Sequence, residues 1–249
     1  MSLLKVENLT VSVANDTVLS ELSFEINEKG IYAILGKNSI EKTTLAKALS
    51  GIVKVDSGKI FYKDVELSND KKGREIKAKI GYVPQECFLY SDMTVYESLE
   101  LTGRMRKVDP DKRIRQIKEA LELLELSNKN QALIKALTVS EKRRLLLANA
   151  LIGNPSVLIL DEPTANATAQ DAEIMRDVIS MLGERKTVLI FTEKLTLANE
   201  MANYVGIMSN GKMALWSSLD NIKEKLGNDS RALVKTFMAF SDDSVRGVR

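Results

Sequence analysis

One stretch of the chain, residues 31 to 45, constrains the fold more than any other. It reads Ile-Tyr-Ala-Ile-Leu-Gly-Lys-Asn-Ser-Ile-Glu-Lys-Thr-Thr-Leu, so an apolar strand leads through a short loop into a helix. A strand that is apolar throughout is typical of a parallel sheet that is covered on both faces. The sequence therefore predicts an α/β fold in which this strand is central.

The loop after this strand nearly matches the phosphate-binding pattern G-x-x-x-x-G-K-[ST]. In that pattern glycines let backbone N–H groups approach phosphates, a lysine reaches the outer phosphates, and a hydroxyl binds magnesium. Gly36, Lys42 and Thr43 fit, but Glu41 stands at the second glycine position. At about 4 Å a carboxylate repels a like charge by about 1 kcal/mol in water and by about 4 kcal/mol in a partly buried site. The alternative is a strand-to-helix turn that binds no phosphate, and the rest of the sequence has to distinguish between the two interpretations.

A second motif supports the phosphate-loop interpretation. Residues 157 to 160 form another apolar strand, which ends at Asp161 and Glu162. Ligands of open α/β sheets bind at the carboxyl ends of the strands. Asp161 would hold magnesium through water, and Glu162 would orient the attacking water as general base. Carboxylates that only cap a helix are the alternative, but the two motifs together favour a nucleotide-binding fold.

The periodicity of the remaining chain predicts two additions to the central sheet. Residues 3 to 26 alternate apolar and polar side chains around a turn at Asn15-Asp16, which indicates an antiparallel sheet. Residues 86 to 138 change to a helical period, and Asp109-Pro110 provides a cap and an N1 proline for the second helix. The apolar positions of these helices are Val95, Leu99, Leu101, Ile114, Ile117, Leu121 and Leu124.

The predicted fold class is therefore α/β, with a mostly parallel sheet like that of P-loop NTPases, an N-terminal antiparallel β subdomain and a helical insertion. We expect a single domain over residues 1 to 249, a helical subdomain at about 86 to 138 and short C-terminal helices at about 217 to 240. Strands are expected at 31–35, 57–62, 80–85, 157–160, 187–191 and 204–208, and helices at 42–51, 140–152 and 195–202.

Composition excludes several classes of function. The net charge is only +2, so no bulk field draws the chain toward nucleic acid or anionic lipid. With Cys87 as the single cysteine, neither an internal disulfide nor a cysteine zinc cluster can form, and the absence of histidine excludes an imidazole base. No signal peptide and no uncharged run of about 18 residues are present, so we expect a cytoplasmic protein that meets a membrane only through a partner.

In the order of its motifs the sequence resembles the nucleotide-binding subunits of ABC transporters, over essentially the whole chain. The resemblance rests on Gly36 to Thr44, Gly81-Tyr82-Val83-Pro84-Gln85, Leu151-Ile152-Gly153-Asn154-Pro155, Val157 to Thr164 and the turn Ser209-Asn210-Gly211-Lys212. It implies ATP and Mg²⁺ as cofactors. The ATP contacts that it implies are Gly36, Asn38, Ser39, Lys42, Thr43, Thr44 and Val13; the metal contacts are Thr43, Gln85 and Asp161; and the catalytic residues are Glu162 and Gln85.

The departures from the family pattern fall at positions that contact the nucleotide or take part in its hydrolysis. The signature Leu-Ser-Gly-Gly-x is replaced by residues 137 to 141, Leu-Thr-Val-Ser-Glu, and Glu193 stands in place of the switch histidine. Ser39 and Glu41 occupy glycine positions of the phosphate loop, and Thr168 replaces the loop aspartate. Val13 stands where an aromatic ring usually stacks on adenine. Because losing one preorganised donor costs about 10²- to 10³-fold in rate, we expect weak hydrolysis.

Three functions are compatible with these observations. The first is an ATP-binding subunit that couples ATP binding and hydrolysis to transport, in the export direction suggested by the short helical insertion, through a separate transmembrane permease subunit. Such a chain would lie at the inner face of the cell membrane and form a homodimer, or a heterodimer with another ABC ATP-binding subunit. The second is a non-catalytic regulatory or structural subunit that pairs with an active paralogue. The third is a soluble ABC protein unconnected to transport.

Overall fold

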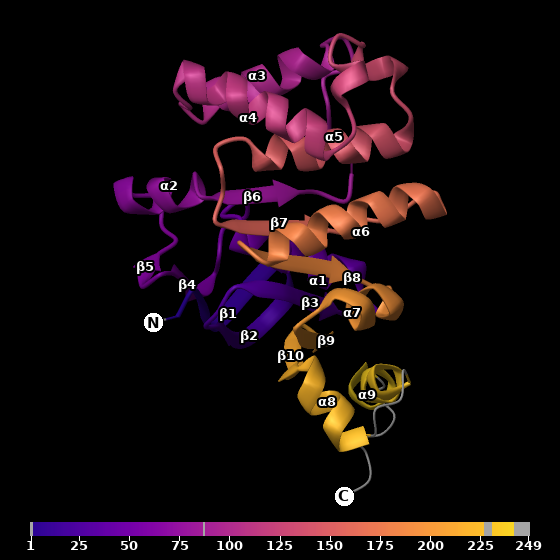
Figure 1. Ribbon diagram of the computed structural model, residues 1–249. Helices are drawn as coiled ribbons and strands as arrows, with labels where there is room; N and C mark the ends of the chain where they lie inside the picture. Colours follow the sequence, from indigo (N-terminus) through magenta and orange to yellow (C-terminus); the bar gives the residue numbers. More distant parts are fainter. Residues whose placement is uncertain (1, 87, 227–230, 242–249) are drawn as a thin grey trace, which may run out of the picture.

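A six-stranded sheet forms the centre of the computed structural model, which describes residues 2–86, 88–226 and 231–241 (Figure 1). Cys87 lies outside the described residues. The strands are β3 (Gly30–Leu35), β6 (Ile80–Val83), β7 (Val157–Asp161), β8 (Thr187–Thr192), β9 (Tyr204–Ser209) and β10 (Lys212–Ser218), in the order β10-β9-β3-β8-β7-β6. All neighbours pair in parallel except β9 and β10. Every residue of β3, β7 and β8 is buried, which confirms the predicted mostly parallel sheet.

Strand β10, which forms a hairpin with β9, has no counterpart in the sequence-based predictions, although β9 and the turn after it were expected. The turn of this hairpin uses Asn210 and Gly211, whose φ angles are +52° and +70°. A Cβ added at Gly211 would lie 2.4 Å from the carbonyl oxygen of Val18, so glycine is required there. β10 shows no alternation of buried and exposed positions, since nearly all of its residues are partly exposed, and this explains why its sequence does not read as a strand.

A second, antiparallel sheet confirms the predicted β subdomain. It contains β1 (Leu4–Val13), β2 (Asp16–Ile26), β4 (Ser57–Tyr62) and β5 (Val65–Glu66), in the order β2-β1-β4-β5. The β1–β2 turn is formed by Ala14 and Asn15, one residue earlier than predicted, with φ angles of +51° and +74°. Helix α1 (Ser39–Leu49) contributes Leu45 and Leu49 to the core that the two sheets share.

The helical insertion consists of α3 (Val95–Met105), α4 (Pro110–Leu123) and two short 3₁₀ turns, η1 (Ser127–Lys129) and η2 (Ile134–Ala136), and α5 (Val139–Leu151) follows it. Thr94 and Asp109 cap α3 and α4, the latter as predicted. Most of these apolar positions are buried, but Ile114 is 58% exposed. Ile114 lies one turn before Ile117 on the same face of α4, but only Ile117 and Leu121 belong to the core.

The remaining helices are α2 (Lys71–Lys77), α6 (Ala169–Gly183), α7 (Leu195–Met201), α8 (Leu219–Leu226) and α9 (Ala232–Ser241). α6 shares a core with α3, α4 and α5, and it runs across the face of the central sheet in Figure 1. α8 and α9 pack beside β9 through Leu219, Ile222 and Leu233. In the described part of the chain, no helix combines the length and the apolar character needed to cross a bilayer.

Candidate functional site

Most of the predicted site residues gather at the carboxyl ends of three adjacent strands. β3 leads into residues 36 to 44 and α1, β7 ends at Asp161, and β8 ends at Thr192 beside Glu193. Because β8 lies between β3 and β7, the topology brings together segments that are far apart in the sequence. This is the edge at which ligands of open α/β sheets bind.

The start of α1 is set by Asn38. Its side-chain oxygen accepts a hydrogen bond of 2.9 Å from the backbone N–H of Ile40, which is the usual role of a cap residue. The helix therefore begins at Ser39, three residues before the predicted start. Glu41, at the position of the second glycine of the pattern, is only 8% exposed and its Oε1 lies 3.4 Å from Nδ2 of Asn38. Asn38 therefore caps α1 and also contacts Glu41, and both residues lie within the phosphate loop.

Lys42 is buried, with 1% of its surface exposed, and it is bound by the chain's own oxygens. Its Nζ donates to the carbonyl oxygen of Gly36 at 2.7 Å and to Oε1 of Glu193 at 3.1 Å. The hydroxyl of Ser39 donates to the same Oε1 at 2.8 Å. The Ser39 hydrogen bond, together with the charge of Lys42, lowers the pKa of Glu193. A carboxylate of the chain therefore meets the lysine that the pattern assigns to phosphate.

Thr43 and Asp161 form the second contact of the site. The Thr43 hydroxyl donates to Oδ2 of Asp161 at 2.7 Å, while Oδ1 of Asp161 is buried and has no hydrogen-bond partner. Burial raises the pKa of Asp161, and the Thr43 hydrogen bond opposes this shift. An unpaired carboxylate oxygen beside a threonine hydroxyl fits a hydrated Mg²⁺, which uses one or two carboxylates together with waters and phosphates. Within the described residues, no cluster of three or more acidic or cysteine side chains offers a different metal cage.

Gln85 follows β6 by two residues and is exposed. No hydrogen bond joins it to Asp161 or Thr43 in the described part of the chain. Its role as a metal contact and catalytic residue stays a prediction. Thr44 is buried in α1 directly after Thr43.

Glu162 has an unusual backbone, with φ at +47°. Its N–H donates to the carbonyl oxygen of Phe191 at 2.9 Å, and its carboxylate accepts from the Thr192 hydroxyl at 3.0 Å and the Glu193 N–H at 2.8 Å. Burial raises the pKa of Glu162, and these two hydrogen bonds oppose the shift. A left-handed conformation in a residue other than glycine costs about 1–3 kcal/mol and is concentrated at functional sites.

Val13 borders a hollow beside the phosphate loop. The hollow has a volume of about 470 Å³, and Asn38, Ile40, Glu41 and Asn210 also line it. Val13 is 44% exposed there, so it can offer an apolar contact to a base but no aromatic face. Val13 thus lies beside the phosphate loop, while its contact with a nucleotide stays a prediction.

In the segment that replaces the family signature, residues 137 to 141, side chains of the segment itself hydrogen-bond the N–H groups at the start of α5. Thr138 accepts from the N–H of Glu141 at 3.1 Å, and Glu141 accepts from the N–H of Thr138 at 2.8 Å, which together form a capping box at the start of α5. Val139, between them, is 64% exposed. Thr168 caps α6, since its side chain accepts a hydrogen bond of 3.2 Å from the N–H of Asp171. The start of α5 therefore already holds a carboxylate, where a bare helix N-terminus would attract an external anion.

Sequence reasoning identified Glu193 and Ser39 as departures, but not as partners. The two residues are separated by 154 positions and meet only because β8 lies next to β3. The sequence does contain a signal for this contact, because Ser39 places a hydroxyl at a glycine position of the loop and Glu193 places a carboxylate at the histidine position. Together they form a donor and an acceptor.

Comparison with known proteins agrees with this geometry. The family model described as ABC transporter matches residues 19–165. A molybdate/tungstate import ATP-binding protein of Methanocaldococcus jannaschii is 34% identical over 227 residues, which cover 89% of this chain and 73% of that protein. A lantibiotic transport ATP-binding protein of Streptococcus pyogenes is 30% identical over 230 residues (91% and 96%). A lipopolysaccharide export system ATP-binding protein of Haemophilus influenzae is 32% identical over 194 residues (78% and 80%).

Solved structures share the fold over nearly the whole chain. The structure of an ATP-binding subunit of an ABC transporter superposes with a TM-score of 0.84 and 20% identity, and it covers 95% of this chain and 100% of that chain. A nucleotide-free ATP-binding cassette from an ABC transporter gives a TM-score of 0.79 at 20% identity, with 99% and 98% coverage. The phosphate loop, the acidic strand end and these matches together lead to one conclusion: the chain belongs to the ABC transporter family, as a nucleotide-binding subunit.

Proposed function

We propose that this subunit binds ATP with Mg²⁺ weakly, hydrolyses it slowly, and couples it to transport through a separate transmembrane permease subunit. The observation that carries the proposal is the Glu193 carboxylate, which accepts hydrogen bonds from both Lys42 and Ser39. A phosphate group needs the same ammonium and the same region of the loop. The Glu193 carboxylate would therefore compete with the phosphates of ATP for Lys42 and Ser39.

ATP binding would require this carboxylate to move. The Glu193 side chain is 51% exposed, so it has room to turn toward solvent, whereas the Lys42 side chain is 1% exposed and stays in place. The Glu193 N–H can remain on Glu162 during this movement, because only side-chain torsions need to change. The loop from Gly36 to Thr44, with Asn38 and Ser39, would then bind the phosphates, and Val13 would contact the base.

Bound Mg²⁺ would neutralise phosphate charge as ATP is hydrolysed. Thr43 and Asp161 are the residues that would hold it, together with Gln85. Glu162 would act as general base on water, but its carboxylate is already engaged by Thr192 and by the Glu193 N–H. A carboxylate at position 193 provides no hydrogen-bond donor to a developing charge, and a missing donor of this kind costs about 10²- to 10³-fold in rate. Slow turnover follows.

The resemblance to ABC subunits implies a dimer in which two subunits pack head to tail, with the signature segment of each, residues 137 to 141 here, facing the phosphate loop of the other. The site between them would then be weakened on the signature side as well. There, the start of α5 is occupied by the Glu141 carboxylate and the exposed Val139 replaces a glycine. A homodimer and a heterodimer with another ABC ATP-binding subunit both remain proposals. The closed capping box specifically favours the second candidate function, a non-catalytic regulatory subunit paired with an active paralogue.

The direction of transport is proposed as export, at the inner face of the cell membrane, because the short helical insertion is like that of small exporter subunits. Among the relatives named above, one is described as an import protein and one as part of an export system, so this part of the proposal rests on the insertion alone.

Calorimetric titration with Mg²⁺-ATP, followed by a phosphate-release assay, tests the proposal. We expect binding in the high micromolar to millimolar range and turnover that falls to background in Glu162→Gln. Binding without turnover would favour the regulatory candidate. Tight binding with fast turnover by the unmodified chain would overturn the proposal, since Glu193 could not then be competing for Lys42.

A further inference from the structure

Three lysines stand directly before parallel strands at the end of the central sheet that lies opposite the phosphate loop. Lys29 precedes β3, Lys186 precedes β8 and Lys79 precedes β6, whereas Ser156 precedes β7. These strands are consecutive neighbours in the sheet. Three of the four positions at this edge therefore carry a positive charge.

The strand register places these lysines in one row. Gly30 pairs with Thr187, Thr187 with Val157, and Val157 with Ile80, so the residues before them are also aligned. Backbone hydrogen bonds continue the pairing past the strand ends, from the Gly30 N–H to the Lys186 carbonyl and from the Ser156 N–H to the Lys79 carbonyl. Adjacent strands are about 4.8 Å apart, so the row presents charges at multiples of that step.

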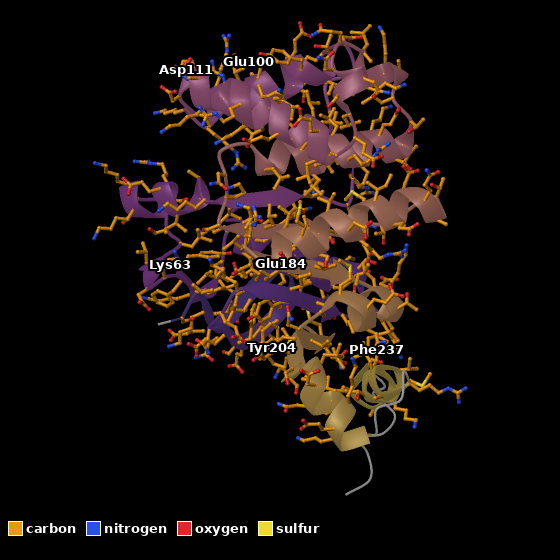
Figure 2. The ribbon with its side chains drawn as sticks, viewed as in Figure 1. Lys63, Glu100, Asp111, Glu184, Tyr204 and Phe237 are labelled. Carbon is orange, nitrogen blue, oxygen red and sulfur yellow. The ribbon has the colours of Figure 1, made fainter. Side chains whose placement is uncertain are left out.

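A cavity of about 300 Å³ opens at this edge, and five cationic side chains line it: Lys29, Lys63, Lys79, Arg185 and Lys186. Lys63 lies on the turn between β4 and β5 and is labelled in Figure 2. No aspartate or glutamate lines the cavity, and no ion pair of the described residues involves any of the five. Their combined charge exceeds the net charge of the whole chain, +2.

The acidic neighbour of Lys29 in the sequence does not neutralise this cluster. Glu28 accepts a hydrogen bond of 3.2 Å from the hydroxyl of Tyr204, at the start of β9, and so faces the other side of β3. Because the whole chain has a net charge of +2 and these five cations contribute +5, the residues outside them sum to −3, so the cluster is a local concentration of positive charge. A cleft lined by one sign of charge concentrates ligands of the opposite sign.

Lys186 forms no ion pair with any acidic side chain in the described part of the chain. It is half-buried, and its ammonium group donates to the Asn154 side-chain oxygen at 2.6 Å and to the Pro155 carbonyl at 2.7 Å, both of which are neutral. Burial, and then the charge of Lys29, lower the pKa of Lys186. An ammonium group has three donors, so one remains for a ligand. Removing a charge from water is costly unless an opposite charge accompanies it.

We propose that this cavity is a binding site for a small ligand with two or more phosphate groups. A single carboxylate could meet one lysine, whereas linked phosphates can meet several members of the row at once. Lysine binds phosphate as a point charge, and the cavity volume is at the lower end of the range for small-molecule sites. The site is remote from the phosphate loop and does not depend on the proposed function.

Inorganic pyrophosphate is the probe, and the full chain with Lys42→Ala is the protein, because that substitution weakens phosphate binding at the loop. We expect saturable binding by calorimetry that weakens with salt, and about a tenfold or larger loss of affinity in Lys29→Ser with Lys79→Ser. Lys71→Ser with Lys72→Ser is the matched control, because it removes the same charge from exposed positions on α2 outside the cavity. The control should bind like its parent.

Absence of saturable binding, or an equal loss in both double variants, would overturn the proposal. Lys29 and Lys79 are exposed, so their substitution leaves the core intact, and Arg185→Ser provides a second variant. Cosedimentation with vesicles of phosphatidylcholine and phosphatidylinositol bisphosphate, whose headgroup carries more than one phosphate group, distinguishes two sources of the phosphates. Sedimentation that depends on Lys29 and Lys79 would assign the site to a lipid headgroup. Its absence, with pyrophosphate bound, would assign the site to a soluble ligand.

Discussion

Replacing Glu193 with glutamine should change nucleotide affinity and stability in opposite directions. Glutamine keeps the size of the side chain and an oxygen that Ser39 and Lys42 can still approach, but it removes the negative charge that competes with phosphate. In the nucleotide-free chain the substitution removes the counter-ion of a buried ammonium, whose distance to Oε1 is 3.1 Å. We therefore expect tighter ATP binding and a less stable nucleotide-free protein.

The magnitude follows from the exposure of the pair. A hydrogen bond to a charged group contributes about 1.5–3 kcal/mol, and an exposed ion pair contributes about 0.2–1 kcal/mol. Since the Glu193 side chain is 51% exposed and Lys42 is buried, a value of about 1–2 kcal/mol lies between these limits. If ATP must displace this contact, its removal raises affinity about 5- to 30-fold. The free energy of unfolding without nucleotide should fall by about the same amount.

The assay is calorimetric titration with Mg²⁺-ATP, together with urea denaturation without nucleotide. Glu184→Gln is the control, because Glu184 is an exposed carboxylate at the end of α6, away from the site and labelled in Figure 2. It should change neither quantity. A folded Glu193→Gln protein with unchanged or weaker ATP binding would refute the reasoning, since Glu193 would then not oppose the phosphate.

Three further expectations follow from single residues. Glu41→Gly should improve ATP binding more than hydrolysis, because it removes a carboxylate from the loop without restoring a donor; equal affinity of both proteins in a titration would contradict this. Hydrogen bonds from Arg104 and then from Arg113 hold the pKa of Glu100 below its ordinary value of 4.5. The stability from Glu100 is therefore full above that value and is lost as the pH falls through the lowered pKa. In urea denaturation, Glu100→Gln should cost about 1–2 kcal/mol at neutral pH and little in acid, and a cost independent of pH would argue against the ion pairs. Gly211→Ala should lower the free energy of unfolding by about 1–3 kcal/mol, because the new Cβ would lie 2.4 Å from the Val18 carbonyl at a φ of +70°. An unchanged denaturation midpoint would show that the turn relaxes freely.

The parallel strands of the central sheet were predictable because they are mostly apolar and are followed by polar motifs. The caps were predictable where an aspartate precedes a proline, as at Asp109. Prediction failed where individual contacts, local or between distant parts of the chain, determine the bounds or the existence of an element. Asn38 starts α1 three residues early, and β10 is a strand only because β9 pairs with it.

The candidate site was predictable residue by residue but not as a network. Lys42, Thr43 and Asp161 stand in recognisable motifs, and the last two are in hydrogen-bond contact. The contact of Glu193 with Lys42 joins residues 151 positions apart, and no local pattern encodes it. The row of lysines at the opposite edge is likewise a product of strand order, which periodicity alone does not provide.

The most direct test of whether Glu193 stands in the place of a phosphate is the distance from Lys42 Nζ to the Glu193 carboxylate, measured in crystal structures without and with Mg²⁺-ATP. The account predicts a distance near 3.1 Å without nucleotide. With ATP bound, the carboxylate should lie beyond hydrogen-bond range and a phosphate oxygen should contact Lys42. A complex in which ATP binds at the loop while Glu193 keeps its contact with Lys42 would contradict the account.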